Sequence, residues 1–515
     1  MLAPALELRD IAKNYHGVIA LDEASLAIAP GSIHGIIGEN GAGKSSLMQV
    51  AYGLVRPDKG SIHIDGVQVD LANPLQAIEH GIGMLHQQAS WLEQLSVFDN
   101  IMLAEPVTGF IYQHTQEARS KLELIRREFG FTFSLDTKVS QLDYSQRQLV
   151  DVLRSLFRGV RVLILDEPLA LLSPTQESYL NNLLQLLKMQ GISVVVVSHK
   201  LAVLHQLCDV ISVIKLGKVV KELEPRQVSL RQLTKQMVGR ELNLPHPRTD
   251  VVTTSNEVVI NVNGIGVNGP KGSDRKPIKP ILSAIDLTVF KGEIVACVGL
   301  PKAGQERLLD VIAGMQPFDS GTLEVLSNTI VAKSRYSIKR ARKYGICYAP
   351  DPILNLGLVG QLTMAESTYL GYQRTGFGRW GIMSMARKNQ HCRQLMKQWS
   401  VVPALPRMQS GMFSGGNQQK MVLAREFEQQ PKLLLLNQPT HGVDAGAIEL
   451  VYQRLFKLRE QGSSTLMCST DLDEVLSVAD RVCVFYQGKL LKILNASETN
   501  KAQLSLLIVK GRLNE

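Results

Sequence analysis

The sequence predicts an α/β protein built as two tandem, homologous domains. Short β-branched runs alternate with longer helical patterns through both halves, the order typical of an α/β sheet domain. Landmarks also recur 271 residues apart, as expected for an internal duplication. The recurring pairs are LDYSQRQ at 142–148 with FSGGNQQ at 413–419, LILDEP at 163–168 with LLLNQP at 434–439, and VVSHKL at 196–201 with MCSTDL at 467–472.

The boundary between the domains is predicted in a short polar segment. At 515 residues the chain is too long for a single core. The stretch ELNLPHPRTDVVTTSN carries two prolines and a Thr/Ser/Asn-rich end that interrupt the periodic pattern. We therefore expect a first domain at 1–240, a linker at 241–256 and a second domain at 257–515. The Gly-rich turns begin at Gly38 and Gly299, 261 positions apart, so the second domain carries ten extra residues before FSGGN.

Composition places the chain among soluble globular proteins, with 45% hydrophobic and 20% charged residues. Its apolar runs, such as 194–197 and 433–436, are far shorter than the roughly 20 residues that span a bilayer. The N-terminus lacks a basic segment followed by an apolar stretch, so no secretory signal is expected. Six cysteines without a CxxC pair argue against a zinc site or disulfide framework and fit a reducing cytosol. A net charge of +9 is compatible with nucleic acid or an anionic membrane surface as a partner, but we favour a modest excess spread over a large surface.

A phosphate-binding loop is predicted in the first half. Residues 38–45, GENGAGKS, follow the apolar strand HGIIG and precede a helical pattern, which is the context that G-x-x-x-x-G-K-[ST] requires. The glycines let backbone N–H groups close on the phosphates, Lys44 reaches the β/γ oxygens, and Ser45 binds Mg²⁺. The expected contacts to ATP are Gly38, Glu39, Asn40, Gly41, Ala42, Gly43, Lys44, Ser45 and Ser46.

Further along the first half, four residues complete a hydrolytic site. The strand VLILDEP ends in Asp166, expected to hold Mg²⁺, and in Glu167, expected to act as base or to position the attacking water. His199 follows the strand ISVVVVS and is expected to contact the γ-phosphate. Gln87 in GMLHQQ is expected to contact the Mg²⁺ ion and the attacking water. Tyr15 is predicted either to stack on adenine or to pack in the core.

This order of phosphate loop, Gln, SGGxQ-type element, DEP and His resembles the ATP-binding subunits of ABC transporters, over nearly the whole chain. The resemblance implies two tandem P-loop ATPase domains of ABC type, each a mixed sheet core with a helical subdomain. In that family two copies bind ATP head to tail, with the phosphate loop of one facing the SGG signature of the other. The second half, SGGNQQKMVLAREF followed by NQPTHGVD, is most similar to tandem ATPases of sugar and nucleoside importers, especially the nucleoside-type branch.

The repeat offsets allow the second half to be compared with the first, residue by residue. Gln305 and Glu306 occupy the positions that correspond to Lys44 and Ser45. The carboxylate of Glu306 would repel a phosphate group bound there. The other replaced positions are Asn437 for the Mg²⁺ ligand, Gln438 for the water-positioning residue, Thr470 for His and Asp351 for Gln. We expect this half to cleave no ATP at a useful rate.

The signature elements are changed in the opposite half. Ser414, Gly415 and Gly416 are intact, whereas the same register in the first half holds Asp143 and Tyr144. If the copies face each other as the family's do, the intact parts meet at one hydrolytic site. Every clear loss then falls on one silent site. Whether that site holds ATP is left open.

The resemblance also implies partners and a location. The chain is expected to lie peripherally on the cytoplasmic face of the inner membrane, with two transmembrane permease subunits and an extracytoplasmic substrate-binding lipoprotein of the basic-membrane-lipoprotein type. A permease heterodimer is favoured and a homodimer stays open. In QASWLEQLSVFDNI, Trp91 and Leu92 either dock a permease helix or lie in the core. Nucleosides or purines are the favoured solutes, with riboflavin or a simple sugar as alternatives.

A soluble tandem ABC ATPase acting on ribosomes or DNA is the main alternative. Family members that act on ribosomes generally keep both sites intact and carry a longer charged linker. Those that repair DNA carry zinc-binding cysteine sets. Neither feature is present in this sequence, so no nucleic-acid partner is expected.

Overall fold

The computed structural model divides the chain into two compact units, 1–242 and 243–515. It describes residues 3–15, 18–39, 41–85, 91–103, 111–142, 144–168, 174–198, 200–238, 256–269, 280–351, 356–372, 378–379 and 382–511. All of the predicted linker except its last residue lies outside these ranges, so its bounds stay a prediction. No helix in the described ranges combines the length and apolar character that crossing a bilayer requires.

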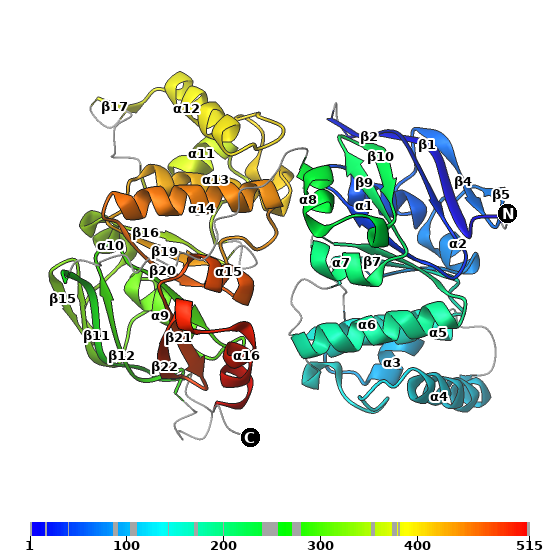
Figure 1. The fold of residues 1–515 in the computed structure, drawn as a ribbon, viewed down its shortest axis with the longest axis horizontal. Helices are drawn as coiled ribbons and strands as arrows, with labels where there is room; N and C mark the ends of the chain where they lie inside the picture. Colours follow the sequence, from blue (N-terminus) through cyan, green and yellow to red (C-terminus); the bar gives the residue numbers. More distant parts are fainter. Residues whose placement is uncertain are drawn as a thin grey trace. The chain divides into compact units, whose positions relative to one another are not determined.

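Unit one is built from two sheets and a group of helices (Figure 1). Its described antiparallel sheet has the order β2-β1-β4-β5, and its larger sheet has the order β10-β9-β3-β8-β7-β6, in which only β10 runs antiparallel to its neighbour. The strands are β1 (Leu6–Tyr15), β2 (Val18–Ile28), β3 (Ile33–Ile37), β4 (Lys59–Ile64), β5 (Val67–Val69), β6 (Ile82–Leu85), β7 (Val162–Asp166), β8 (Ser193–Val197), β9 (Val210–Lys215) and β10 (Lys218–Leu223).

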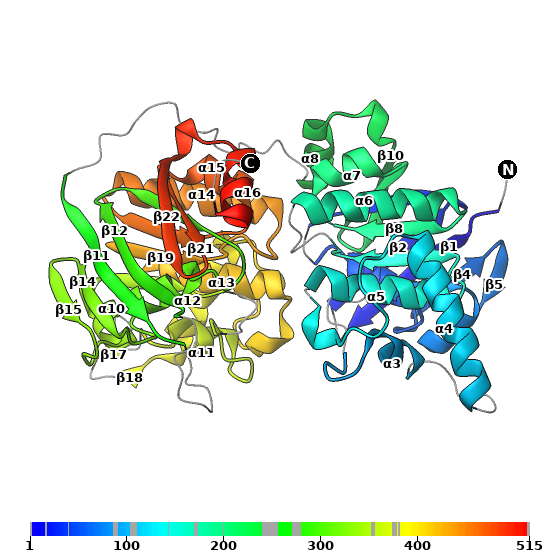
Figure 2. The same cartoon turned by 90° about the horizontal axis from the view of Figure 1, so that it is seen from below.

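The helices of unit one cover the larger sheet and form a helical subdomain beside it (Figure 2). The subdomain consists of α3, α4 and α5, which pack on one another. The helices are α1 (Lys44–Ala51), α2 (Pro74–Glu79), α3 (Val97–Met102), α4 (Ile111–Glu128), α5 (Tyr144–Phe157), α6 (Pro174–Met189), α7 (Leu201–Leu207) and α8 (Leu230–Val238).

Unit two repeats this architecture. Its sheets have the orders β12-β11-β14-β15 and β16-β19-β20-β13-β21-β22, and a small hairpin, β17-β18, lies in the interval that holds the ten extra residues. The strands are β11 (Val258–Val267), β12 (Leu282–Phe290), β13 (Ile294–Val298), β14 (Ser320–Val325), β15 (Asn328–Val331), β16 (Ile346–Ala349), β17 (Gly378–Arg379), β18 (Ile382–Met383), β19 (Leu433–Asn437), β20 (Ser464–Cys468), β21 (Arg481–Tyr486) and β22 (Lys489–Asn495).

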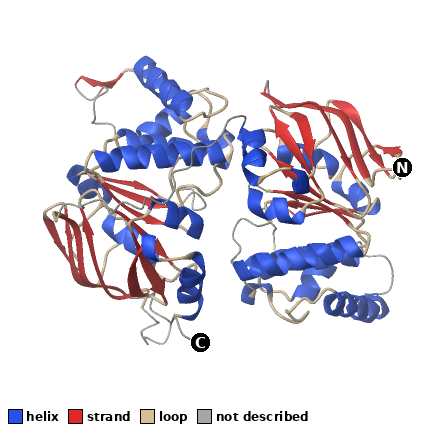
Figure 3. Cartoon of the chain, viewed as in Figure 1, coloured by secondary structure: helices blue, strands red, loops and turns tan. Residues whose placement is uncertain are grey.

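Helices α11, α12 and α13 form the helical subdomain of unit two, so the predicted fold class is confirmed in both halves (Figure 3). The helices are α9 (Gln305–Ile312), α10 (Ile338–Tyr344), α11 (Met364–Tyr369), α12 (Met385–Gln398), α13 (Gly415–Glu428), α14 (Ala445–Glu460), α15 (Leu472–Val478) and α16 (Lys501–Lys510).

The central strands explain why each larger sheet forms a core. Every residue of β3, β8, β13, β19 and β20 is buried, as expected for parallel strands covered on both faces. The run at 433–436, LLLL, is therefore a core strand that needs no charge at its end to fold. Because parallel strands end at one edge, the loops after β3, β7 and β8 lie together, as do those after β13, β19 and β20.

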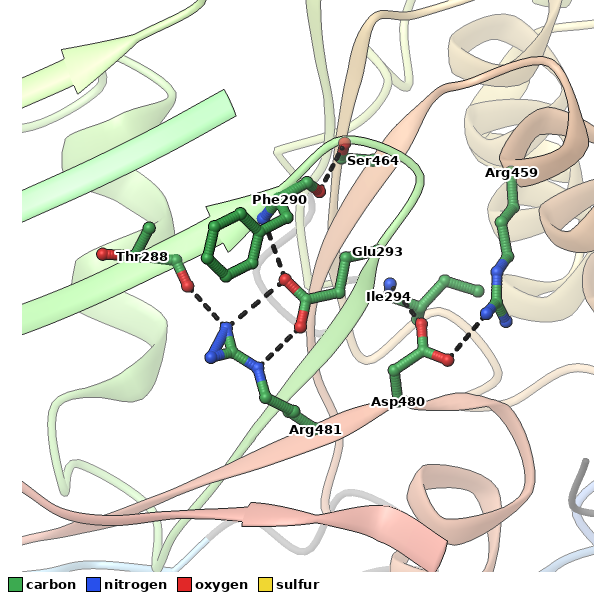
Figure 4. A network of polar contacts seen from close by, with 8 residues as sticks. All are labelled: Thr288, Phe290, Glu293, Ile294, Arg459, Ser464, Asp480 and Arg481. Atoms are coloured by element: carbon green, nitrogen blue, oxygen red, sulfur yellow. Dashed lines mark hydrogen bonds and ion pairs between the residues drawn. The ribbon is translucent and has the colours of Figure 1, made fainter. Parts of the chain in front are cut away.

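A polar network joins the two sheets of unit two (Figure 4). Arg481 of β21 donates to the carboxylate of Glu293 at 2.6 Å and to the carbonyl oxygen of Thr288 in β12 at 2.5 Å. Glu293 also accepts the backbone N–H of Phe290 at 2.8 Å. Since Glu293 is buried, these bonds satisfy its charge and fix β12 against β13.

A second part of the network occurs in both units. Asp480 accepts from Arg459 at 2.8 Å and from the first backbone N–H of β13 at 2.9 Å (Figure 4). In unit one Asp209 accepts from Lys188 at 2.6 Å and from the first backbone N–H of β3 at 2.9 Å. Both central strands are thus anchored in the same way, which places the loops that follow them alike.

Candidate nucleotide site

The predicted phosphate loop of unit one joins β3 to α1. Gly43 has φ of +106°, and a Cβ there would lie 2.6 Å from the carbonyl oxygen of Ala20, so the position requires glycine. Lys44 donates from Nζ to the carbonyl oxygens of Gly38 at 2.7 Å and Glu39 at 3.0 Å. The loop therefore curls around the Lys44 ammonium, which is buried.

The N-terminus of α1 faces the same loop. Its cap residue, Gly43, supplies no side-chain hydrogen bond, and the first turn holds no acidic residue. The first N–H groups of a helix have no partner within the helix, so they and the helix dipole favour an anion at this end. Ser45 and Ser46 lie in this first turn, as the motif predicts.

Asp166 is placed to hold a cation beside the loop. It ends β7, hydrogen-bonds to the side chain of Ser45, and its Oδ1 is buried without a hydrogen-bond partner in the described part of the chain. Burial raises the pKa of Asp166 and the adjacent Glu167 raises it further, while Ser45 and Lys44 act in the opposite direction. A buried carboxylate oxygen next to a serine hydroxyl is a donor set that fits Mg²⁺.

Glu167 adopts an uncommon backbone conformation at the end of β7. Its φ is +54°, and its N–H donates to the carbonyl oxygen of Val197 at 2.9 Å. Gln438 in unit two has φ of +50° and donates in the same way to Cys468 at 2.8 Å. The two positions share one backbone geometry and differ in the charge of the side chain.

In unit two, Gln305 occupies the position of Lys44. Its Nε2 donates to the carbonyl oxygens of Gly299 at 3.3 Å and Leu300 at 3.2 Å, the two positions that correspond to the acceptors of Lys44. Gly304 has φ of +116° at the position of Gly43. The amide of Gln305 thus maintains the shape of the loop without supplying its positive charge.

Carboxylates gather around this second loop, a feature that the residue-by-residue comparison identified only in part. Burial raises the pKa of Glu306, and the neighbouring charges of Asp351 and Asp310 raise it further. Tyr348 donates to Asp310 at 2.9 Å and is hydrogen-bonded to Asn437, whose Oδ1 is buried and unpartnered within the described residues. A phosphate group would meet like charge here.

Gln438 and Thr470 contact each other directly. The Oε1 atom of Gln438 accepts from the N–H of Thr470 at 3.1 Å and from its hydroxyl at 3.2 Å. Behind them lies Glu474, which accepts from the Ser469 hydroxyl and whose pKa burial raises to about 7. Sequence reasoning missed Glu474 because no motif contains it; an acidic residue in an apolar helical pattern, LDEVLSV, was the available signal.

The signature of unit two forms the start of α13. Ser414 is the N-cap of this 14-residue helix, and its side chain accepts from the N–H of Asn417 at 3.4 Å. Gly415 is exposed, with open space where a Cβ would lie, and Gly416 is buried. Backbone N–H groups at this exposed N-terminus can donate hydrogen bonds to a phosphate oxygen.

Other predicted residues lie at the margin of the site or outside the described ranges. Tyr15 ends β1 with 36% of its surface exposed, and Lys13 lies 5.9 Å from its ring centroid, so it is not a core residue. Trp91 is half-buried against Arg154, whereas Leu92 is 58% exposed. Nothing is described of Asn40, Gln87, Asp143 and His199, or of the side chain of Tyr144.

The structure thus brings part of each predicted half-site together within its own unit. Lys44, Ser45, Asp166 and Glu167 lie around one loop in unit one. Gln305, Glu306, Asn437, Gln438 and Thr470 occupy the matching positions in unit two. The approach of Ser414 to the loop of unit one remains a prediction.

Comparison with known proteins identifies one family. A family model described as ABC transporter matches residues 21–170 and 282–441. The nucleoside import ATP-binding protein NupA of Lactococcus lactis subsp. cremoris is 32% identical, with 99% of each chain covered. The guanosine import ATP-binding protein NupO of Bacillus subtilis is 30% identical over 99% of this chain and 98% of its own.

Similarity extends to sugar importers and, at the level of fold, to a ribosomal factor. The ribose import ATP-binding protein RbsA of Pseudomonas putida is 32% identical over 98% of this chain and 95% of its own. A chain in the structure described as a model of ribosome-bound archaeal Pelota and ABCE1 matches with a TM-score of 0.61 at 18% identity, covering 95% of this chain and 79% of that chain. This likeness shows a shared fold.

Proposed function

The chain belongs to the ABC transporter family, and from that premise we propose that it is the ATP-hydrolysing subunit of an importer for nucleosides or related purines. The observation that carries this proposal is the division of the motifs between the units. Unit one holds the cation set around its phosphate loop, with Lys44, Ser45 and Asp166. Unit two holds the open signature at Ser414 and Gly415.

ATP is proposed to bind between these two parts at one composite site. Lys44 and the N-terminus of α1 would bind the phosphates, and Ser414 to Gly416 would approach the γ-phosphate from the other unit. Glu167 would position the attacking water, with His199 and Gln87 in their predicted roles. The silent site would combine Gln305, Glu306, Asn437, Gln438 and Thr470 with Asp143 and Tyr144.

Mg²⁺ is the metal that this donor set suits. Ser45 and Asp166 would hold it, and Gln87 is proposed as a further ligand. When bound, Mg²⁺ neutralises charge that develops on the phosphates. Because Asp166 has a raised pKa, protons compete with the metal for this carboxylate as the pH falls.

The solute is inferred from the relatives. Two of them are described as nucleoside and guanosine import ATP-binding proteins, and a third as a ribose import ATP-binding protein. Nucleosides share the ribose ring with the third solute, and riboflavin or a simple sugar are the alternatives. The chain is proposed to work with two permease subunits, as a heterodimer, and a substrate-binding lipoprotein, at the cytoplasmic face of the membrane.

Uptake of labelled nucleoside tests this function. Cells lacking the chain should lose uptake, and a plasmid copy should restore it, whereas a copy carrying Lys44→Ala should not, because that copy lacks the phosphate-binding cation. A matched copy carrying Gln305→Ala should restore uptake. Loss of ribose or riboflavin uptake, with nucleoside uptake intact, would contradict the proposed solute.

Changes at the silent site are expected to have little effect on hydrolysis. Gln305→Ala or Asn437→Ala should leave the ATPase rate of the assembled transporter near the wild-type rate, since no turnover is assigned there. The double change Asn437→Asp with Gln438→Glu should not create a second active site, because Glu306 and Asp351 still oppose phosphate. A large loss of rate from Gln305→Ala, measured at steady state, would contradict the one-site proposal.

A further inference from the structure

The net charge of +9 is concentrated in one part of the chain. Residues 327–425 hold fifteen Lys and Arg residues and two acidic residues, Asp351 and Glu366, a net charge of +13. The corresponding residues of unit one, 66–154, hold seven basic and eleven acidic residues, a net charge of −4. These two corresponding stretches therefore differ strongly in charge, and the interpretation of an evenly spread excess is wrong.

Helix α12 presents one regular part of this charge. Arg387, Arg393 and Lys397 are exposed, and the helix contains no acidic residue. No carboxylate pairs with these three side chains in the part of the chain that the structure describes. The other exposed residues from 386 to 398 are one alanine and three glutamines, so this stretch, which we term the α12 basic face, lacks a large apolar side chain. Met385, the first residue of the helix, is 55% exposed and lies at its end.

The corresponding helix of unit one, α4, carries acidic residues at two of these positions. When Cys392 is aligned with Leu122, both fully buried, Arg387 corresponds to Glu117 and Arg393 to Glu123. Glu123 of α4 pairs with Arg126 at 2.6 Å and with Arg127 at 3.3 Å. Arg126 and Arg127 of α4 are thus paired with a carboxylate of their own helix, whereas the cations on the α12 basic face are not.

A second group of exposed cations lies on and before α10. It comprises Lys333, Arg335, Lys339, Arg340 and Lys343, with no acidic residue between 325 and 350. Like charges left close together repel one another, a cost that an anionic partner would remove. The excess therefore points to a partner of negative charge for unit two.

We infer that the α12 basic face binds the anionic headgroups of the lipid bilayer. Protein partners are usually anchored by buried aromatic or apolar side chains, and single-stranded nucleic acid by exposed aromatic rings; the α12 basic face has neither. A headgroup layer requires only charge, and each Lys or Arg near it strengthens binding about fivefold. This inference rests on the proposed membrane location and is independent of ATP cleavage.

Binding of the full chain to vesicles tests the inference. The wild-type chain should sediment with vesicles of phosphatidylcholine plus phosphatidylglycerol but not with phosphatidylcholine alone, and salt should release it. The variant R387Q/R393Q/K397Q should bind about a hundredfold more weakly, the product of three fivefold losses. Its thermal midpoint and ATPase rate should stay at wild-type values, because the changed side chains are exposed and belong to none of the nucleotide motifs.

The control variant, K221Q/K489Q/K492Q, removes the same number of charges from exposed positions on β10 and β22. It should bind the vesicles nearly as the wild type does. Equal binding by R387Q/R393Q/K397Q and the wild type, or no preference for phosphatidylglycerol, would overturn the inference. A further outcome would be that the wild type does not bind vesicles, while R387Q/R393Q/K397Q, unlike the wild type and the control variant, no longer binds membranes that contain the permease. In that case the partner is an acidic surface of the permease, and the lipid assignment is wrong.

Discussion

Lys44→Ala and Gly415→Asp should each lower the ATPase rate of the assembled transporter by about two orders of magnitude, equal to about 2.7 kcal/mol of transition-state stabilisation. Lys44→Ala removes the ammonium that the loop of unit one encloses. Gly415→Asp places a carboxylate at the exposed start of α13, where it would face the same γ-phosphate. The two changes lie in different units yet should produce the same defect.

Matched variants distinguish a loss of activity caused by charge from one caused by damage to the fold. Gly415 has open space around its Cβ position, so Asp should fit without a clash. Gly415→Asn adds nearly the same volume without charge and should retain at least about tenfold more activity than Gly415→Asp, about 1.4 kcal/mol. Gln305→Ala is the counterpart of Lys44→Ala in unit two. Normal hydrolysis by Gly415→Asp would show that the signature of unit two does not serve the working site.

Glu167→Gln should bind ATP and fail to cleave it. The change removes the group that positions the attacking water while leaving Lys44, Ser45 and Asp166 in place. Turnover should fall by about two orders of magnitude or more. Bound nucleotide recovered from the variant should be ATP rather than ADP, and a filter-binding assay should show affinity at or above that of the wild type.

Unit two supplies the control for this variant. Gln438 already adopts the backbone geometry of Glu167, so glutamine is compatible with a φ near +50° at the end of such a strand. Gln438→Glu makes the reciprocal change and should leave the rate nearly unaltered. Wild-type turnover by Glu167→Gln would show that another residue positions the water.

Much of the candidate site could be predicted because its chemistry depends on residue type and spacing. A phosphate loop needs glycines and a lysine at set positions, and a strand ending in two carboxylates marks a metal ligand and a base. The structure places Lys44 and Asp166 accordingly. The fold followed from the internal repeat and from buried strands such as 433–436.

The features that escaped prediction depend on side-chain contacts between distant residues. Gln305 was predicted as a lost cation, but its hydrogen bonds to the loop carbonyls follow only from three-dimensional structure. Glu306, Asp310 and Asp351 interact although they come from α9 and from the segment after β16. Glu474 lies outside every motif, and its pKa depends on burial that a single sequence does not reveal.

The number of ATP molecules cleaved per chain in one turnover tests the central claim most directly. The assembled transporter would be loaded with labelled ATP, freed of excess nucleotide, and mixed with its substrate-bound binding protein. One composite site, made from Lys44 of unit one and Gly415 of unit two, predicts one ATP cleaved per chain, and none in Lys44→Ala. Two ATP cleaved per chain would contradict the account.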